Sequence, residues 1–417
     1  MRTGIAMTMQ QFYAQQLSLP QPWRVDEVRV SEAEKAVHVW IGRPVGTPLD
    51  CPSCGKALCV YDHYPVRTWR HLDSCAYSTY AHARVPRVNC PEHGVLTVRL
   101  PWAEPRAQQT RWQEVKTIQV LHVCDVQGTA TVLGQSWDEC FGVMERAVER
   151  GQQRKDKKLA TKLGVDEKAA SKGHRYFTLV NDLTRGVVDK VLLGRKAEPL
   201  VSYFNEFPKE QREQVEAVAM DMSGPFRLAV EEAIPGAQAK IVYDRYHIMA
   251  LMNRAVDTVR KEENSLLRKE GDQILVGTKY LWLYGEERLP DRYLQRFEQL
   301  RARTLATGRA YALKETLRTL WQCETREQAQ TVFKRWYFWA THSRLEPVIK
   351  AAKTLCTHLP QILTYFVHRI TNATSEGLNS VVQRLKVRAC GYRNSNNFIT
   401  AIYFYCGGLD LYPHAIA

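Results

Sequence analysis

The stretch Val215-Glu-Ala-Val-Ala-Met-Asp221 is a short, mostly apolar run that ends in an aspartate. Leu163-Gly-Val-Asp166 has the same form earlier in the chain, and Ala239-Lys-Ile-Val-Tyr-Asp244 repeats it later. Short apolar runs separated by amphipathic stretches are typical of strands in a sheet that helices cover. The three runs therefore predict buried strands, each with an acidic residue at its end.

The surrounding pattern completes an α/β region that is followed by helices only. The order of three strands, helix, strand, helix and strand predicts a mixed α/β sheet. After Asp244 the strand pattern stops, and the apolar periodicity becomes that of helices. The further elements expected are strands at residues 176–180 and 187–193, helices at 200–207 and 226–233, a helical region at 246–368, and one last helix at 374–388.

Three acidic residues are candidates for a catalytic metal site. Asp166 and Asp221 end two of the expected strands, and Glu376 lies early in the last helix. Three carboxylates suit two Mg²⁺ (or Mn²⁺) ions, which can activate a water or a 3′-hydroxyl at a phosphodiester. A single acidic residue is more often a solvated surface group, so spacing alone does not select these three. Their competitors are Glu167, Asp182, Asp189 and Asp244.

Two Cys- and His-bearing turns indicate a zinc site. Cys51-Pro-Ser-Cys54 and Cys90-Pro-Glu-His93 offer three thiolates and one imidazole, which is enough for closed tetrahedral Zn²⁺. Gly55 and Gly94 suit tight turns that aim backbone amides at the sulfurs. The alternative is ordinary buried cysteines with His93 on the surface, but the pairing of the two turns favours zinc. No ligand position is left open for water, so we expect a structural site.

The stretch from Val126 to Met144 predicts a helix-turn-helix. Ala130 is small enough for the interior of the first helix, Gly134 lies in the turn, and Ser136 with Glu139 forms a capping box that starts the second helix. Such a helix can place its first residues in a DNA major groove. An ordinary helical hairpin is the alternative.

Charge points to a polyanionic partner. The 417 residues include 58 lysines and arginines against 44 aspartates and glutamates, a net charge of +14, which favours DNA. The residues predicted to contact DNA are Ser136, Trp137, Arg146, Arg150, Lys155, Lys157, Lys158, Lys172, Asn379, Gln383, Lys386 and Arg393.

The remaining composition excludes other classes of protein. No apolar run approaches the roughly 20 residues needed to span a bilayer, and the first residues lack a secretory apolar core. We therefore expect a cytosolic chain without a membrane partner. Its 11 cysteines are then expected to be thiols or metal ligands rather than disulfides.

Several stretches together resemble the ISL3 family of bacterial insertion-sequence transposases. They are Leu163-Gly-Val-Asp-Glu-Lys168, Lys172-Gly-His-Arg-Tyr176, Val218-Ala-Met-Asp-Met-Ser-Gly-Pro-Phe226, Val242-Tyr-Asp-Arg-Tyr-His247, Thr374-Ser-Glu-Gly-Leu-Asn-Ser380 and Cys390-Gly-Tyr-Arg-Asn394. The N-terminal Cys-x-x-Cys module and the helix-turn-helix also fit, so the resemblance covers nearly the whole chain.

The resemblance implies an α/β catalytic core of RNase H-like type with a large all-helical insertion, plus an N-terminal zinc-binding β module and a helix-turn-helix. By resemblance, Asp166, Asp221 and Glu376 are the DDE residues. Asp244 and His247 are similar to an Asp-x-x-His motif, which we interpret as a structural or DNA-positioning pair. His93 stands where cysteine is more usual, and it is an equally competent ligand.

The expected domains follow from this resemblance. They are the β and zinc-binding module, the helix-turn-helix, the first part of the core, the insertion, and the C-terminal part of the core with the glutamate helix. Their expected bounds are residues 1–100, 107–155, 160–250, 251–368 and 369–417, in that order.

The activity that the resemblance implies is Mg²⁺-dependent DNA cleavage and strand transfer at the terminal inverted repeats of a mobile element, by a homodimer or larger assembly on element-end and target DNA. A catalytically inactive, transposase-derived DNA-binding regulator is the main alternative. Its hallmark would be a lost carboxylate, yet all three candidates are present. A structure-selective nuclease would need neither an end-recognition module nor a long insertion.

Overall fold

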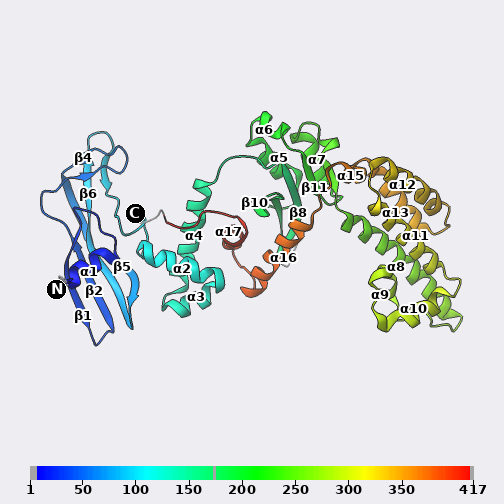
Figure 1. Cartoon of the computed structure of the whole chain (residues 1–417), viewed down its shortest axis with the longest axis horizontal. Coiled ribbons are helices and arrows are strands. Elements are labelled where there is room, and N and C mark those ends of the chain that lie inside the picture. Colours follow the sequence, from blue (N-terminus) through cyan, green and yellow to red (C-terminus); the bar gives the residue numbers. More distant parts are fainter. Residues whose placement is uncertain (1–6, 172–174, 414–417) are drawn as a thin grey trace, which may run out of the picture. The chain divides into compact units, whose positions relative to one another are not determined.

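The computed structural model describes residues 7–171 and 175–413, which form two compact units (Figure 1). Unit 1 holds the described residues up to Asp156, Arg388–Cys390 and the described residues from Asn396 onward. Unit 2 holds the described residues of Lys157–Val387 and Gly391–Ser395. The chain thus starts in unit 1, forms unit 2 and returns to unit 1. The finer domain bounds expected from the sequence stay predictions.

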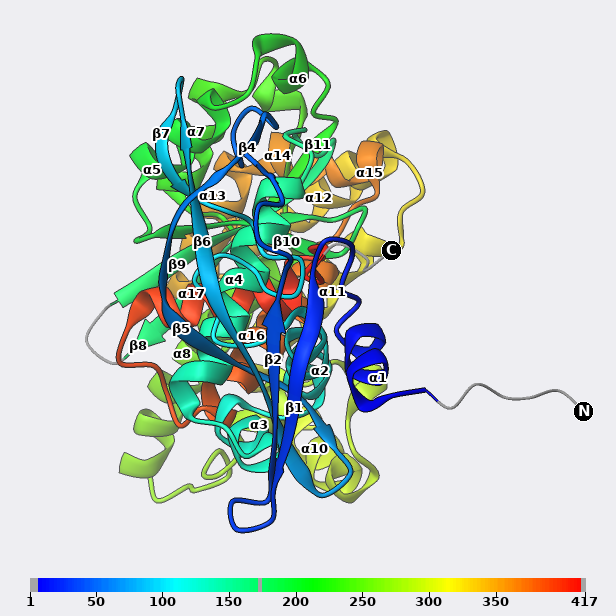
Figure 2. The ribbon, with the colours of Figure 1, turned by 90° about the vertical axis from the view of Figure 1, so that its left-hand side faces the viewer.

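Unit 1 begins with a β module in which one sheet face is buried. The order of the larger sheet is β1-β2-β6-β5 with β7 paired to β6, and its long strands run side by side in Figure 2. In β2, Val37, Val39 and Ile41 are buried, while His38, Trp40 and Gly42 between and after them are half-buried, as expected for a sheet with one solvated face. The elements are α1 (Met9–Gln16), β1 (Arg24–Ser31), β2 (Ala36–Gly42), β3 (Leu49–Asp50), β4 (Ala57–Leu58), β5 (Val60–Ser74), β6 (Tyr77–Cys90) and β7 (Gly94–Thr97).

Helices complete unit 1. They are α2 (Arg111–Val123), α3 (Val126–Leu133), α4 (Trp137–Arg154) and, from Asn396 onward, α17 (Ser395–Cys406). The turn between α3 and α4 contains Gly134 in the left-handed conformation, and the capping box of Ser136 and Glu139 starts α4, as predicted. The last helix joins this group through Tyr405, whose hydroxyl donates to the backbone oxygen of Leu121 at 2.5 Å.

Unit 2 contains the mixed α/β sheet that the sequence predicts. The strand order is β10-β9-β8-β11-β12. β8, β9 and β10 pair antiparallel, whereas β11 runs parallel to both β8 and β12. Every residue of β11 and β12 is buried, because parallel strands are covered on both faces. The elements are β8 (Lys162–Ser171), β9 (Arg175–Asp182), β10 (Val187–Leu193), α5 (Ala197–Asn205), α6 (Lys209–Glu213), β11 (Ala217–Met220), α7 (Gly224–Ala233), η1 (Ala237–Ala239) and β12 (Ile241–Tyr243).

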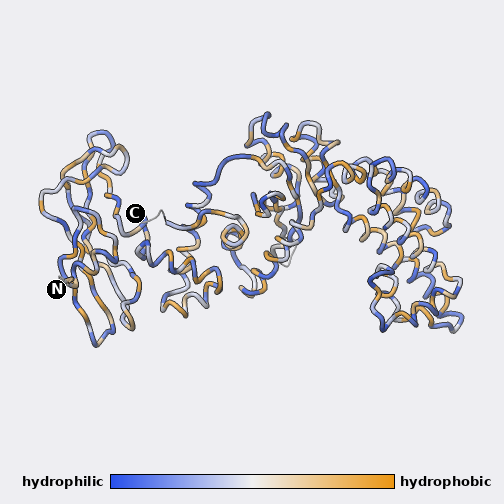
Figure 3. The backbone as a smooth tube through the Cα atoms, in the orientation of Figure 1, coloured by the Kyte–Doolittle hydropathy of each residue, from blue (hydrophilic) through white to orange (hydrophobic). Residues whose placement is uncertain are grey.

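Beyond β12, residues 245–413, all of which the structure describes, contain helices and no strand. This confirms the helical region predicted from the periodicity. Figure 3 shows hydrophobic and hydrophilic residues alternating along these helices. They are α8 (Arg245–Lys269), α9 (Lys279–Leu283), η2 (Glu286–Arg288), η3 (Asp291–Tyr293), α10 (Leu294–Arg301), α11 (Ala306–Arg318), η4 (Thr319–Gln322), α12 (Arg326–Thr341), α13 (Glu346–Thr357), α14 (Leu359–Leu363), α15 (Tyr365–His368) and α16 (Ala373–Arg388), before α17.

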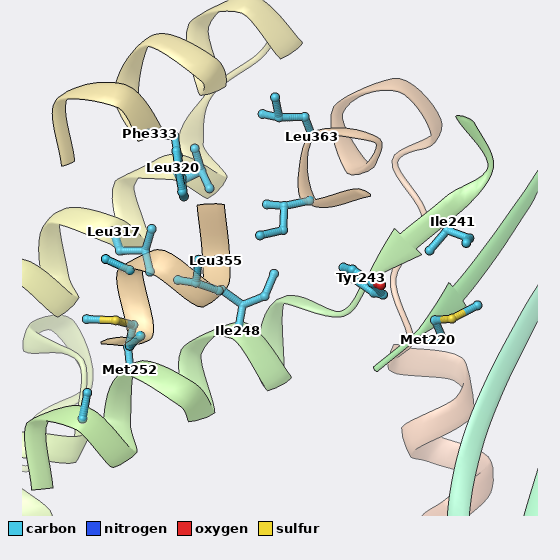
Figure 4. Packing of buried hydrophobic residues seen from close by; sticks show 14 of the residues in the cluster. Met220, Ile241, Tyr243, Ile248, Met252, Leu317, Leu320, Phe333, Leu355 and Leu363 are labelled. Carbon is cyan, nitrogen blue, oxygen red and sulfur yellow. The ribbon is translucent and has the colours of Figure 1, made fainter. Parts of the chain in front are cut away.

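One hydrophobic core joins the sheet of unit 2 to its helical region. Met220 of β11 and Tyr243 of β12 belong to the same buried cluster as Met252 of α8, Leu317 of α11 and Leu355 of α13 (Figure 4). Each fully buried side chain of this kind stabilises the fold by about 1.5–3 kcal/mol. The helical region is therefore held to the sheet by continuous packing. In the described part of the chain, no helix has the length and apolar character needed to cross a membrane.

Candidate functional site

The two Cys- and His-bearing turns of unit 1 meet at one point. Candidate ligand atoms of Cys51, Cys54, Cys90 and His93 all lie within 4.8 Å of one another. The Sγ atoms of Cys54 and Cys90 are 3.8 Å apart, and Sγ of Cys90 is 3.5 Å from Nδ1 of His93. Among residues 7–171 and 175–413, no other group of three or more such residues is this close. The predicted four-ligand cluster is therefore present.

The local backbone prepares these sulfurs for a metal. Gly55 and Gly94 have φ values of 74° and 69°, which only glycine adopts readily. They close the turns after Cys54 and His93. A hydrogen bond from the backbone of Glu92 lowers the pKa of the Cys90 thiol, and burial opposes it. A lowered thiol pKa favours the thiolate, which is the form that binds Zn²⁺.

In unit 2, the sheet brings three aspartates to one level. Met220 is in register with Val165 on one side and with Tyr243 on the other. The next residue in each of these three parallel segments is Asp166, Asp221 or Asp244. Since neighbouring strands lie about 4.8 Å apart, the aspartates form a row across β8 and the ends of β11 and β12.

Burial and the charges of neighbouring aspartates raise the pKa values of Asp166 and Asp221. Burial raises the pKa of Asp166 to about 6, and the charges of Asp221 and Asp244 act in the same direction. Burial also raises the pKa of Asp221, to which Asp244 adds. The charge of His247 lowers the pKa of both groups. These effects place Asp166, Asp221, Asp244 and His247 in one electrostatic environment.

Helix α16 lies against β8 and supplies the fourth acidic residue. A Cβ on Gly164 would stand 2.2 Å from Oγ of Ser375, so only glycine permits this close approach. Nδ2 of Asn379 donates to Oδ2 of Asp166 at 2.5 Å, and Nζ of Lys386 donates to the backbone oxygen of Ala169 at 3.1 Å. These contacts fix the position of the whole helix on the sheet.

Glu376, in the first turn of α16, is exposed. Burial raises the pKa of Glu376, and the charge of Asp244 raises it further. Within the described chain, no three of the four carboxylates lie within 4.8 Å of one another. The structure thus brings Asp166 and Asp221 to one level of the sheet and Glu376 into the electrostatic environment of Asp244, and the triad stays a prediction.

A cleft of about 910 Å³ adjoins these carboxylates. Asp244 and Glu376 form part of its wall, and the helical region supplies the opposite side. Other lining residues include Tyr246, Arg288, Arg318 and Trp321. Both carboxylate and arginine side chains therefore line the cleft.

The structure places the other predicted site residues in different settings. Ser136 and Trp137 are exposed at the start of α4, and Lys157, Lys158, Gln383 and Arg393 are exposed elsewhere. Lys155 is half-buried, and Lys172 lies outside the described residues. Arg146 and Arg150 both bond the fully buried carboxylate of Glu114. Those two guanidinium groups therefore hold α4 to α2.

Known protein families match both the region of the Cys- and His-bearing turns and the region of the acidic sheet. A family described as transposase, of the ISL3 DDE type, matches residues 163–402, more than half of the chain. A family described as zinc-finger of transposase IS204/IS1001/IS1096/IS1165 matches residues 47–93. This match spans the four-ligand cluster, and together they support a structural zinc site.

Curated relatives agree with the family matches. The transposase for insertion sequence element IS1001 of Bordetella parapertussis is 27% identical over 364 residues, which cover 86% of this chain and 89% of that protein. The transposase for insertion sequence element IS1557 of Mycobacterium tuberculosis (strain ATCC 25618 / H37Rv) is 25% identical over 374 residues, 84% of each chain. With its carboxylate-bearing sheet and its zinc cluster both inside matched regions, the chain belongs to the ISL3 family of DDE transposases.

Proposed function

We propose that this insertion-sequence transposase cleaves DNA and transfers strands with Asp166, Asp221 and Glu376 as its metal-binding residues. The observation that carries the assignment is the placement of Asp166 and Asp221 at one level on adjoining parallel strands, with α16 laid on β8 by the contact between Gly164 and Ser375. We further propose that this sheet and α16 are the RNase H-like core that the sequence predicts.

The residues present fit two divalent cations such as Mg²⁺. All the candidate ligands are hard carboxylate oxygens, which Mg²⁺ prefers. Oδ2 of Asp244 is buried without a hydrogen-bond donor among the described groups, and burial raises the pKa of Asp166, to which the negative charges of Asp221 and Asp244 add. Held by Asp166, Asp221 and Glu376, two such cations would offset the negative charge, and they would supply activation of the attacking water or 3′-hydroxyl and stabilisation of the leaving oxygen.

The chain's own side chains orient this site. The backbone N–H of Glu167 and the amide of Asn379 each bond one oxygen of Asp166, so its carboxylate has a single orientation. The N–H of Ser223 bonds Asp221 in the same way at 3.1 Å. His247, on the first turn of α8, supplies a nearby group that favours the charged carboxylates. Preorganisation of this kind lowers the barrier without a covalent protein intermediate.

DNA recognition is proposed for unit 1. The zinc-binding module and the α3–α4 pair together bind the terminal inverted repeats, with α4 as the recognition helix. Trp137 is 40% exposed and stacks on Phe141 with ring centroids 4.7 Å apart, which presents it at the start of the helix. Lys157 and Lys158, at the start of unit 2, are exposed and suit backbone phosphates. Because two element ends must be joined, the active form is a homodimer or larger assembly.

Asp221→Asn tests the catalytic assignment. The substitution keeps the size of the side chain and removes its charge. Cleavage of element-end DNA in Mg²⁺ is expected to fall at least about a thousandfold, since metal-based charge stabilisation contributes several kcal/mol. Binding to the same DNA is expected to stay near the wild-type level.

Two results would contradict this assignment. Full cleavage activity in Asp221→Asn would remove Asp221 from the site. A wild-type chain that binds element-end DNA without cutting it in Mg²⁺ or Mn²⁺ would indicate the inactive regulator instead.

A further inference from the structure

We propose that Asp244 is a fourth metal-binding carboxylate of this site and that it holds one of the two cations together with Glu376. The inference rests on the proposed function and extends it, because the sequence alone indicated a structural or positioning role for Asp244.

The first argument is the position of Asp244 in the sheet. Tyr243 of β12 is in register with Met220 of β11, so Asp244 follows Asp221 at the same level as Asp221 follows Asp166. Three aspartates on adjoining strands span about 10 Å, at about 4.8 Å per strand. Two cations in such enzymes lie about 3.5–4 Å apart, so a row of this length accommodates both.

The second argument is an unsatisfied oxygen. Asp244 is only 6% exposed. Its Oδ1 accepts a hydrogen bond from the backbone N–H of Tyr246 at 3.0 Å, whereas its Oδ2 is buried and receives none from any described group. A buried, unpaired carboxylate oxygen is costly. A cation bound at Oδ2 would remove that cost.

The third argument is that Asp244 and Glu376 face the same cleft. Asp244 and Glu376 both line the cleft of about 910 Å³, whereas Asp166 and Asp221 are not among its lining residues. Asp244 also follows Tyr243, which is in register with Met220, the residue before Asp221. Asp244 therefore stands between the other two aspartates and the cleft that Glu376 lines, so that Asp244 and Glu376 could hold one cation together.

A role for Asp244 as a helix cap alone makes a different prediction. Asp244 is the N-cap of α8, and that task uses only Oδ1. Asparagine caps helices about as well as aspartate. Asp244→Asn therefore keeps the cap and removes the anionic oxygen, which separates the two roles.

The experiment measures Mn²⁺ bound to the full-length, zinc-loaded chain by electron paramagnetic resonance titration. Asp244→Asn is expected to lose one bound Mn²⁺ or to weaken it at least about tenfold. The matched control is Asp257→Asn, which removes a buried carboxylate from the same helix, where it pairs with Arg260 and Lys261. The control is expected to bind Mn²⁺ like the wild type. Asp221→Asn serves as the reference for the other cation.

The outcomes separate this inference from the proposed function. Wild-type Mn²⁺ binding in Asp244→Asn, with binding lost in Asp221→Asn, would overturn the role of Asp244 and leave the proposed function standing. Lost cleavage with unchanged Mn²⁺ binding in Asp244→Asn would assign a positioning role and also overturn it. An absence of Mn²⁺ binding to the wild type would contradict both.

A second measurement needs no variant and so does not depend on the folding of one. Fe²⁺ bound in place of Mn²⁺, with ascorbate and peroxide, generates hydroxyl radicals that cut the backbone beside the metal ligands. Cuts are expected next to residues 166, 221, 244 and 376. Cuts at the other three positions without one at Asp244 would overturn the proposal.

Discussion

Gly164 is the residue on which the placement of α16 depends most directly. Any side chain at this position would enter the space of Ser375, and a Cβ would also stand 2.8 Å from Leu183 and 3.2 Å from Asn372. Glu376 is the residue after Ser375, so a displaced helix moves the glutamate with it. A packing contact thus determines the position of a proposed catalytic group.

Gly164→Ala is expected to lower the free energy of unfolding by about 1–3 kcal/mol through overpacking and to reduce DNA cleavage. Urea denaturation and the cleavage assay measure the two effects. Gly377→Ala is the control on α16, because a Cβ there meets nothing within 4 Å. Adding Ser375→Ala to Gly164→Ala is expected to restore part of both losses. Unchanged stability and cleavage in Gly164→Ala would show that α16 does not depend on this contact.

Individual residues also show which contacts the sequence alone does not reveal. Arg146 and Arg150 were predicted to contact DNA because a sequence displays charge without its partner, and the structure pairs both with the buried Glu114. Asp244 was a competitor among the acidic residues and, by resemblance, part of a structural or positioning pair, since its unsatisfied oxygen and the cleft that it shares with Glu376 are visible only in three dimensions. The apolar runs before Asp166, Asp221 and Asp244 were the available signal, although β8 does not end at Asp166 as predicted but continues to Ser171.

At the scale of elements, the β3–β4 and β6–β7 turns form the zinc cluster. The turn after β3 carries Cys51 and Cys54, Cys90 is the last residue of β6, and His93 lies in the turn between β6 and β7. A structural metal supplies folding free energy directly. We therefore expect bound zinc to stabilise the mutual position of the two turns.

Cys51→Ser combined with Cys54→Ser is expected to reduce bound zinc from about one ion per chain to near zero. Elemental analysis of the purified chain measures the stoichiometry, and limited proteolysis reports whether the module has loosened. Cys59→Ser is the control, because Cys59 is exposed and outside the cluster. Unchanged zinc in the double variant would contradict the four-ligand assignment.

Elements with a regular apolar pattern were predictable from the sequence. The strand expected at 187–193 is β10 (Val187–Leu193), and the helix expected at 374–388 is α16 (Ala373–Arg388). The capping box of Ser136 and Glu139 likewise predicted where α4 starts. The return of α17 to unit 1 was not predictable, because it depends on contacts such as that between Tyr405 and Leu121, which join distant parts of the chain.

At the scale of the whole molecule, we expect unit 2 to unfold as one cooperative body, because a single buried cluster runs from its sheet into its helical region. No boundary in that cluster separates the helices that line the cleft from the strands that carry the aspartates. The cleft and the acidic row are therefore expected to keep a constant geometry relative to each other.

Leu317→Ala tests this cooperativity. Leu317 of α11 is 1% exposed, so the substitution is expected to cost about 2–5 kcal/mol. If unit 2 unfolds as a whole, hydrogen exchange at the β11 amides is expected to accelerate at least about 30-fold, the equivalent of 2 kcal/mol. Leu266→Ala is the control, because Leu266 is 60% exposed on α8. Unchanged β11 protection alongside early melting of the helices would contradict a shared core.

The return of the chain to unit 1 has a consequence during synthesis. Phe398, Ala401, Ile402 and Phe404 of α17 are buried, and from Asn396 onward the described residues belong to unit 1. Translation proceeds from the N-terminus, so these residues leave the ribosome only after the whole of unit 2. We therefore expect a nascent or truncated polypeptide to lack the packing that α17 gives to unit 1 until unit 2 has been made, so that premature termination would leave the proposed DNA-binding region incomplete.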